Sequence, residues 1–443
     1  MANVYWHGDG GNWSDFTNHW FNATDGGGGS HGAAPGADDN AIFDLNSFDN
    51  PAQTVTIDAN STCLNMTWTG ATNTPTLATA TNRLDYYGDV TLITAMSVTG
   101  TTGRFNAASN GAQSFTSNGC PLGCKFMSAT ADPTVTLADD LVVTNTAADS
   151  IFFVVGTLVT GGNTITDSGQ IDVSGGTITP SSSTINCTAW LAIATTTITA
   201  NTATINVTGT GAVALGTANW NGADFNLNGT AHTVTGTGTG IVHFTRTGTA
   251  AACTVTFNSD LVVDGTLTLN GNAVGNRLTV GGTANILTCL SFAGNHVDFS
   301  TPLTLILTNA GAGATTFAGN GQTYPHVRQE GAGAYALTIS GNNTFAKFRN
   351  DSSAAVKTTT ITPASTQTIR NLQVFSSAAN VAVFNTGGAA ATIQKHRGYC
   401  ELNHVNLTSI VATEKYRYYA GNNSTDGTGN TNWIFTHKAR GVE

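Results

Sequence analysis

The composition of the chain is unusual for its length. Of 443 residues, 16 are Lys or Arg and 26 are Asp or Glu, so only 9% are charged. An ordinary globular domain is about a quarter charged, and disordered chains with few hydrophobic residues usually carry a strong net charge, so neither class fits. Short apolar runs separated by Thr, Gly, Asn, Ala and Ser instead predict an all-β fold, a right-handed parallel β-solenoid.

The first segment, residues 1–50, is rich in Trp and Gly and shows no strand periodicity. Trp6, Trp13 and Trp20 recur every seven residues, but the glycines between them argue against a helix. The open end of a solenoid exposes unpaired strand edges and an apolar cross-section. We therefore expect this segment to be an N-terminal cap or attachment segment, in which the three Trp and Phe43 cover the first turn.

The second segment, residues 51–325, is predicted to be the solenoid itself, with roughly 20 residues in each turn. Runs rich in Val, Ile, Leu and Thr alternate there with Gly and Asn turns. The predicted strands include residues 54–57, 90–93, 151–155, 203–207 and 303–307. An internal repeat supports a repeating fold, because the sequence of residues 134–143 recurs in similar form at residues 254–263.

The third segment, residues 326–443, gains Phe, Tyr, Lys and Arg and is predicted to be a β-rich region that closes the solenoid. Trp433 and Phe435 are expected to form an aromatic closure, and residues 438–443 a loose tail. Residues 328–443 hold eleven basic and six acidic residues, whereas residues 1–82 hold eight Asp and no Lys or Arg. We interpret this as a more conventional C-terminal region, with attraction between protomers or to an acidic partner as the alternative.

The sequence also disfavours several other classes of protein. The basic residues are scattered, so nucleic-acid binding is not expected. No apolar run of about 18 residues is present, so no membrane insertion is predicted, and the first residues lack a basic and apolar leader. The seven Cys are odd in number and widely spaced, so they are expected to be buried free thiols. They stand at positions 63, 120, 124, 187, 253, 289 and 400.

Paired carboxylates would be needed if the chain cleaved polysaccharide, as some β-helical proteins do. The candidates are Asp139, Asp140, Asp149, Asp167 and Asp172. The chain has four Glu, and Asp224 is the single acid between residues 173 and 259. Acidic residues are therefore too scarce to favour an acid/base pair. We expect the candidates to cap backbone amides in turns, and we predict no catalytic residue.

Metal and cofactor motifs are equally weak. Cys120 and Cys124 could supply two thiolates, but no second pair lies at zinc-like spacing. A Ca²⁺ or Zn²⁺ ion that stabilises the first segment is one interpretation. The preferred interpretation is that polar residues of its loops hold the segment together. The residues available for such an ion are His7, His19, His31, Asp9, Asp15, Asp38 and Asp39. Residues 28–32 match the letters of a nucleophile elbow, yet no strand or helix flanks them. No metal or cofactor is predicted.

Aromatic side chains are the remaining candidates, because they can stack on sugar rings. Trp190 and Trp220 are interpreted either as sugar platforms or as buried residues that stack between turns. The Tyr pairs are expected to be exposed and are the possible glycan contacts: Tyr86, Tyr87, Tyr418 and Tyr419.

A resemblance is carried by motifs near the two ends of the chain. The opening motifs are Trp6-x-Gly8, Gly11-Asn12-Trp13-Ser14-Asp15, Asn18-His19-Trp20, Pro35 and Asp38-Asp39-x-x-x-Phe43-Asp44. They resemble the N-terminal lead-in of β-solenoid proteins from bacteriophage virions and bacterial surfaces, including autotransporter-type strand repeats. Residues 317–324, 341–345, 357–358 and 420–435 resemble phage tail or fibre proteins.

The resemblance implies a non-enzymatic virion structural protein, foremost a tail fibre, tailspike or head fibre for host-surface attachment. Its contacts would be weak but multiplied over several copies. The implied partners are a homotrimer, other virion proteins and a host surface glycan or protein. The implied location is the surface of the particle, after synthesis in the host cytoplasm. A capsid decoration protein, a bacterial surface adhesin and a polysaccharide-degrading tailspike are the alternatives.

Overall fold

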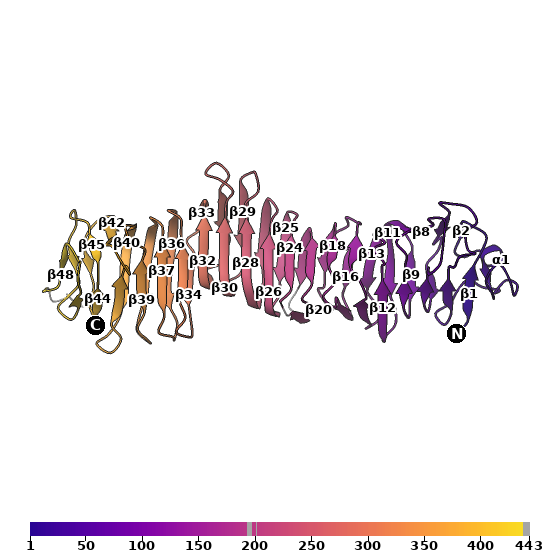
Figure 1. Ribbon diagram of the computed structural model, residues 1–443, viewed down its shortest axis with the longest axis horizontal. Helices are drawn as coiled ribbons and strands as arrows, with labels where there is room; N and C mark the ends of the chain where they lie inside the picture. The colour runs from indigo at the N-terminus through magenta and orange to yellow at the C-terminus, as the bar shows by residue number, and fades with distance from the viewer. Residues whose placement is uncertain (193–196, 201, 437–443) are drawn as a thin grey trace. The chain divides into compact units, whose positions relative to one another are not determined.

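The protein is described by a computed structural model over residues 1–192, 197–200 and 202–436 (Figure 1). Within these residues the chain is all-β apart from one short helix, α1 (Phe16–His19). The strands stack in parallel on partners from the preceding and following turns, so the fold is a β-solenoid. The predicted fold class is confirmed, while its right-handedness stays a prediction. The predicted loose tail, residues 438–443, lies outside the described residues.

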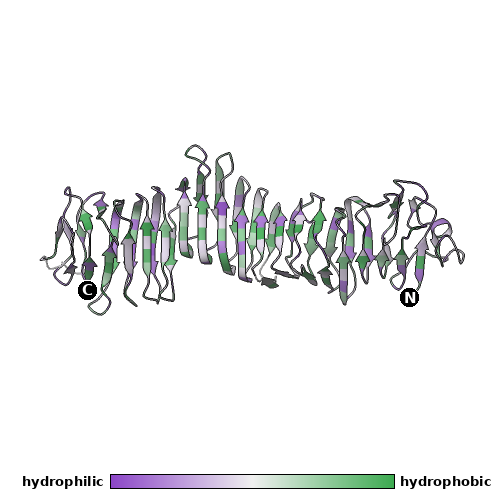
Figure 2. Ribbon diagram, in the orientation of Figure 1, coloured by the Kyte–Doolittle hydropathy of each residue, from purple (hydrophilic) through white to green (hydrophobic). Residues whose placement is uncertain are grey.

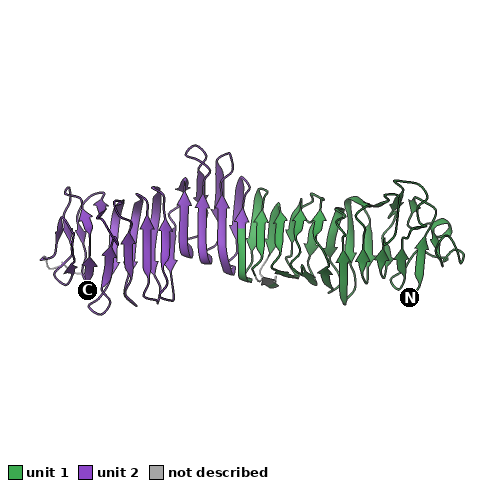
Figure 3. Cartoon of the chain, viewed as in Figure 1, with its two compact units in different colours: residues 1–225 green, residues 226–443 purple. Residues whose placement is uncertain are grey.

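The chain divides into two compact units, residues 1–225 and 226–443 (Figure 3). Strand β26 (Asn219–Leu227) contains the boundary. The predicted boundaries near residues 50 and 325 do not coincide with it, and the three-segment division stays a prediction. Parallel pairing continues past both predicted boundaries, since Ala41 pairs with Met66 in unit 1 and Thr304 pairs with His326 in unit 2.

The described part of unit 1 has three rows of strands, so each turn is three-sided. The first row is, in spatial order, β3 (Trp20–Phe21), β1 (Asn3–Trp6), β4 (Asn40–Ile42), β7 (Met66–Thr67), β10 (Val90–Thr91), β12 (Ala112–Thr116), β14 (Thr134–Leu137), β17 (Thr157–Val159), β20 (Thr177–Ser181) and β23 (Thr197–Ala200). The second row is β2 (Gly11–Asn12), β5 (Thr54–Thr56), β8 (Thr76–Ala80), the first halves of β11 (Ser97–Ala107) and β13 (Leu122–Ser128), β15 (Leu141–Val143), β18 (Ile165–Asp167), β21 (Thr184–Cys187) and β24 (Thr204–Val207). The third row is β6 (Ser61–Cys63), β9 (Arg83–Tyr86), the second halves of β11 and β13, β16 (Ile151–Phe153), β19 (Gln170–Asp172), β22 (Ala189–Ala192) and β25 (Gly211–Leu215).

Unit 2 continues the same construction with longer strands. One row contains β27 (Ala231–Thr235), β29 (Cys253–Phe257), β31 (Leu278–Gly281) and β33 (Val297–Phe299). Beside it lie β28 (Thr239–Thr247), β30 (Leu261–Asn270) and β32 (Ile286–Asn295), and β32 then pairs with both β34 (Thr304–Thr308) and β35 (Thr315–Ala318).

The second half of unit 2 carries two further series of strands and a small sheet. One series is β36 (Thr323–Glu330), β38 (Thr344–Asp351), β40 (Thr366–Phe375), β42 (Ala391–Lys395) and β45 (Ile410–Ala412). The other is β37 (Ala336–Ser340), β39 (Thr358–Ile361), β41 (Ala382–Asn385), β44 (Val405–Leu407) and β47 (Thr425–Asp426). The small sheet is β43 (Cys400–Glu401), β46 (Tyr418–Tyr419) and β48 (Trp433–Ile434).

The strand sequences explain why the turns stack. In a strand, successive side chains point to opposite faces, so β24 buries Ile205 and Val207 and turns Thr204 and Asn206 outward. The inward Ile205 stacks on Ile185 of the preceding turn, and Asn206 donates an amide hydrogen bond to the Asn186 side chain at 2.8 Å. Figure 2 shows the resulting alternation of hydropathy along the strands. Burying each such apolar side chain contributes roughly 1.5–3 kcal/mol.

Residues 1–50, which show no strand periodicity in the sequence, contain four short strands, β1 to β4. β1 pairs parallel with β4 and antiparallel with β3, which lies at the end of the first row. Three of these strands are two or three residues long, too short to show alternation in the sequence. The helix α1 is a single turn, in which the Asp15 side chain accepts a hydrogen bond from the Asn18 amide.

All seven Cys are buried and free, as the sequence predicts. They behave as small apolar residues, and burial raises the pKa of the Cys124 thiol to about 12. The Cys124 side chain therefore packs as a neutral thiol.

A buried polar cluster crosses the core of unit 2 around Asn350. The Asn350 side-chain amide donates to Gln329 Oε1 at 3.1 Å and to Thr359 Oγ1 at 3.0 Å. The Ser352 hydroxyl donates to Asn350 Oδ1 at 2.8 Å, and all four residues are fully buried. A buried polar cluster stabilises a fold only while its members remain paired.

We expect Asn350→Ala to lower the free energy of unfolding by about 2–3 kcal/mol, because it leaves buried partners without a hydrogen bond. Urea denaturation followed by circular dichroism measures the change. Asn371→Ala is the matched control, since Asn371 is exposed on β40 of the same unit and should change stability by less than about 0.5 kcal/mol. An equal loss of unfolding free energy in the two variants would show that the buried cluster around Asn350 does not contribute to stability in this way.

Candidate functional site

The candidate carboxylates Asp139 and Asp140 lie in the corner between β14 and β15. Asp139 accepts hydrogen bonds from the backbone amides of Ser117 at 2.7 Å and Asn118 at 2.5 Å. Asp140 accepts one from the Thr164 amide at 2.7 Å. Each carboxylate therefore caps the backbone of an adjacent turn, in agreement with the predicted structural role.

The other candidate carboxylates are also engaged within the fold. Asp149 forms an ion pair with Lys125, and Asp172 accepts from the Ser174 amide at 2.9 Å. Asp167 is 4% exposed and accepts from the Ser150 hydroxyl at 2.7 Å. Burial raises the pKa of Asp167 to about 6, an effect that its hydrogen bonds only partly offset. A side chain so enclosed cannot reach a polysaccharide.

The metal candidates do not come together. Among the described residues, no group of three or more His, Cys, Asp or Glu is placed to hold a metal ion. The imidazoles of His7, His19 and His31 each lie about 3 Å from a backbone carbonyl oxygen, of Asn46, His7 and Ala33 respectively. Asp9, Asp15 and Asp39 accept backbone amide hydrogens. Protein hydrogen bonds thus hold this segment together.

The Cys pair is equally unsuited to a metal. Cys120 and Cys124 are buried, and burial raises the pKa of the Cys120 thiol to about 11. A metal ligand must be a thiolate, which this environment disfavours.

The prediction that both members of each Tyr pair are exposed is wrong. Tyr86 and Tyr418 are fully buried, while Tyr87 and Tyr419 are half-buried. Tyr418 and Tyr419 are adjacent in β46, where successive side chains point to opposite faces, and Tyr86 ends β9 with its side chain in the core. The Tyr418 hydroxyl accepts a hydrogen bond from the Lys395 amide at 2.6 Å and serves the fold. Glycan contact by Tyr87 and Tyr419 stays a prediction.

Trp190 and Trp220 are not sugar platforms, because both are fully buried. Their ring centroids lie 5.7 Å apart in the core of unit 1. Of the two interpretations made from the sequence, burial in the core is therefore the correct one, although the ring planes are tilted by 58° rather than stacked.

The predicted cap residues form one aromatic cluster in unit 1. Trp6, Trp13, Trp20 and Phe43 are each at most 1% exposed, and Phe43 stacks on Trp68 with ring centroids 3.7 Å apart. The indole of Trp20 donates to the Trp13 carbonyl at 2.8 Å. Their role as a cap stays a prediction.

The predicted closure residues at the other end are less enclosed. Trp433 and Phe435 are half-buried, and the Trp433 ring lies 5.3 Å from that of Tyr418. This partial burial leaves the closure a prediction too.

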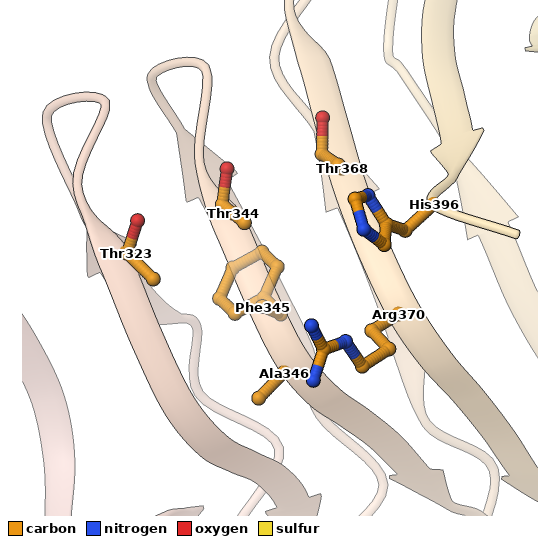
Figure 4. A pocket seen from close by; sticks show the side chains of 7 residues that line it. All are labelled: Thr323, Thr344, Phe345, Ala346, Thr368, Arg370 and His396. Carbon is orange, nitrogen blue, oxygen red and sulfur yellow. The ribbon is translucent and has the colours of Figure 1, made fainter.

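A surface pocket in unit 2 was missed by sequence reasoning. It has a volume of about 250 Å³ and lies across β36, β38 and β40 (Figure 4). Its lining residues are Thr323, Thr344, Phe345, Ala346, Thr368, Arg370 and His396. These residues come from four successive turns, so the pocket exists only once the turns have stacked.

The pocket lies where the strands turn a corner. In β38 the buried side chains are Phe345, Phe348 and Asn350, and two residues rather than one separate Phe345 from Phe348. Ala346 and Lys347 therefore both fall on the outer corner, and the small Ala346 leaves a hollow there. Figure 4 shows the Arg370 side chain reaching from β40 toward Ala346, with His396 beside it.

The comparisons do not assign this site. No protein family, curated protein or solved structure matches the chain. None of the helical residues that the structure describes forms a segment able to cross a membrane. The functional interpretation therefore rests on the residues themselves.

Proposed function

We propose that the protein is a non-enzymatic structural protein of a bacteriophage virion that attaches the particle to a host surface, as a tail fibre, tailspike or head fibre. The observation that carries the proposal is the surface pocket on stacked β-solenoid strands, whose lining contains no carboxylate. The virion assignment is supported by the end motifs of the sequence. The protein would then lie on the surface of the particle.

The absence of an enzymatic role in this proposal follows from the carboxylates. Asp139 and Asp140 hold backbone amides, Asp149 is paired with Lys125, and Asp167 is buried. Glycoside hydrolysis needs two carboxyl groups flanking an accessible substrate. The proposed function is therefore binding alone.

The test is binding of the purified, fluorescently labelled protein to intact host cells, together with an assay for reducing ends released from their surface polysaccharide. Saturable binding without release is expected. Release that Asp139→Asn abolishes would replace the proposal with a depolymerase. No binding to cells, with the protein located on purified capsids by immunogold labelling, would replace it with a decoration protein.

We expect the protein to be a homotrimer in solution, because multiple copies raise the avidity of weak surface contacts. Light scattering should give three times the 45.4 kDa mass of the chain, stable on dilution. A monomer at all concentrations would contradict the trimer and favour a component that assembles only on the particle.

A further inference from the structure

A row of threonine hydroxyls forms one side of the pocket. Thr323 pairs in register with Thr344, and Thr344 with Thr368, so the three stand on adjacent strands. Neighbouring strands are about 4.8 Å apart, a spacing close to the length of one sugar residue in an extended chain. Figure 4 shows the three hydroxyls projecting from the same side of their strands. Such a row can exchange hydrogen bonds with successive sugar hydroxyls.

The floor of the pocket is apolar. Phe345, which is fully buried, and the small Ala346 both line it. The C–H faces of pyranose rings pack on apolar surfaces of this kind, while their hydroxyl edges face polar groups. The hollow above Ala346 therefore suits a sugar ring lying across the strands.

The positive charge at the pocket is uncompensated. Three other Arg of unit 2 form ion pairs: Arg277 with Asp298, Arg328 with Glu330, and Arg349 with Asp351. Among the described residues, no acidic side chain pairs with Arg370, and no carboxylate lines the pocket. Arg370 is exposed, so its planar array of donors is open to a ligand.

Further basic residues lie among or beside the residues that line the pocket. His396 lines the pocket, Lys347 lies on the same outer corner, and Arg397 is exposed next to His396 in the chain. None of these side chains forms an ion pair within the residues that the structure describes. A local positive potential of this kind attracts an anion.

We propose that the pocket binds an acidic saccharide. Its carboxylate would pair with Arg370, its hydroxyls would bond to the threonine row, and one ring would lie over Ala346. A neutral glycan would leave the cationic groups unused, and a simple anion would leave the threonine row and the apolar floor unused. The inference rests on the proposed attachment function and names the class of surface ligand that the protein recognises.

Isothermal titration with oligogalacturonate tests the inference, with the fully methyl-esterified oligosaccharide as the matched neutral ligand. The wild type should bind the acid form and not the ester. Arg370→Gln should weaken binding about tenfold or more, because a bidentate, charge-assisted pair is lost. Arg417→Gln makes the same charge change at an exposed position of unit 2 outside the pocket and should bind as the wild type. Ala346→Tyr keeps the charge but fills the hollow, and it should abolish binding.

Three outcomes would overturn the inference: equal weakening by Arg370→Gln and Arg417→Gln, undiminished binding by Ala346→Tyr, or displacement of the oligosaccharide by equimolar inorganic phosphate. Thermal unfolding of each variant establishes that it is folded. Cell binding separates the two proposals. Wild-type and Arg370→Gln proteins that bind host cells equally well would remove the acidic-saccharide site and leave the attachment function standing. A wild type that binds acidic saccharide but not cells would remove the attachment function instead.

Discussion

Replacement of Phe43 by alanine is expected to lower the free energy of unfolding of unit 1 by about 3–5 kcal/mol. Phe43 is fully buried and lies at the centre of the aromatic cluster. Its ring centroid lies 3.7 Å from that of Trp68, 5.5 Å from Trp20 and 5.7 Å from Trp6. Truncation would open a cavity that rigid indole rings cannot fill, so most of the lost contact energy would remain uncompensated.

Guanidinium denaturation followed by Trp fluorescence measures this loss, and hydrogen exchange locates it. Each turn of a solenoid contacts only its neighbours, so lost amide protection should concentrate in β1, β4 and β7. Phe16→Ala is the control, because Phe16 is 38% exposed in the same segment and should cost less than about 0.5 kcal/mol. Protection lost evenly throughout unit 1 would show that the cluster does not act locally.

Asp167→Asn is expected to stabilise the protein at pH 7 by up to roughly 3 kcal/mol, because a buried carboxylate is replaced by a neutral amide. Burial raises the pKa of Asp167 to about 6, whereas an unfolded Asp titrates near 3.8. Between these values the folded state holds a proton that the unfolded state has released. The wild type therefore loses stability as the pH rises from about 4 to about 6, and the loss stays constant above that range.

Urea denaturation at intervals from pH 4 to pH 7 tests this prediction. The variant should match the wild type near pH 4, become progressively more stable than it up to pH 6, and then keep a constant advantage. Asn can still accept from the Gly169 amide, as Asp167 does at 3.1 Å. Asp132→Asn is the control at an exposed position of unit 1 and should change stability by less than about 0.5 kcal/mol. If Asp167→Asn were less stable than the wild type at pH 7, the buried carboxylate of Asp167 would not be the cause of the lost stability.

The fold class could be predicted because its determinants are local. Alternation such as Thr204, Ile205, Asn206, Val207 is visible in any short window, and scarce charge rules out most other folds. The internal repeat of residues 134–143 at residues 254–263 also has a structural cause. Asp140 and Asp260 occupy equivalent positions in the two copies, and each accepts backbone amides from the next turn, at Thr164 and at Asn285.

The pocket could not be predicted, because it depends on the register between turns. Thr323, Thr344 and Thr368 are brought together by turns of unequal length, followed by a longer one to Gln394. No fixed repeat period therefore aligns these residues in the sequence. The excess of basic residues after residue 328 was the available signal, and it marks a region rather than a site.

The Tyr pairs and the first strands show two separate effects. Tyr86 is the last residue of β9 and faces the core, whereas Tyr87 lies just beyond the strand and is half-buried. In residues 1–50, strands as short as Gly11–Asn12 form only because a neighbouring turn supplies the partner for their backbone groups. Pairing across turns, rather than local propensity, decides these elements.

The burial of every cysteine has a consequence for assembly. Because all seven thiols lie in the core, the outer face has no sulfur with which two chains could be joined covalently. Any complex of several copies is therefore held without disulfide bonds between the chains. A single cysteine introduced at Val274, which is 73% exposed, would then be the one accessible thiol, and its crosslinking would identify the faces that meet.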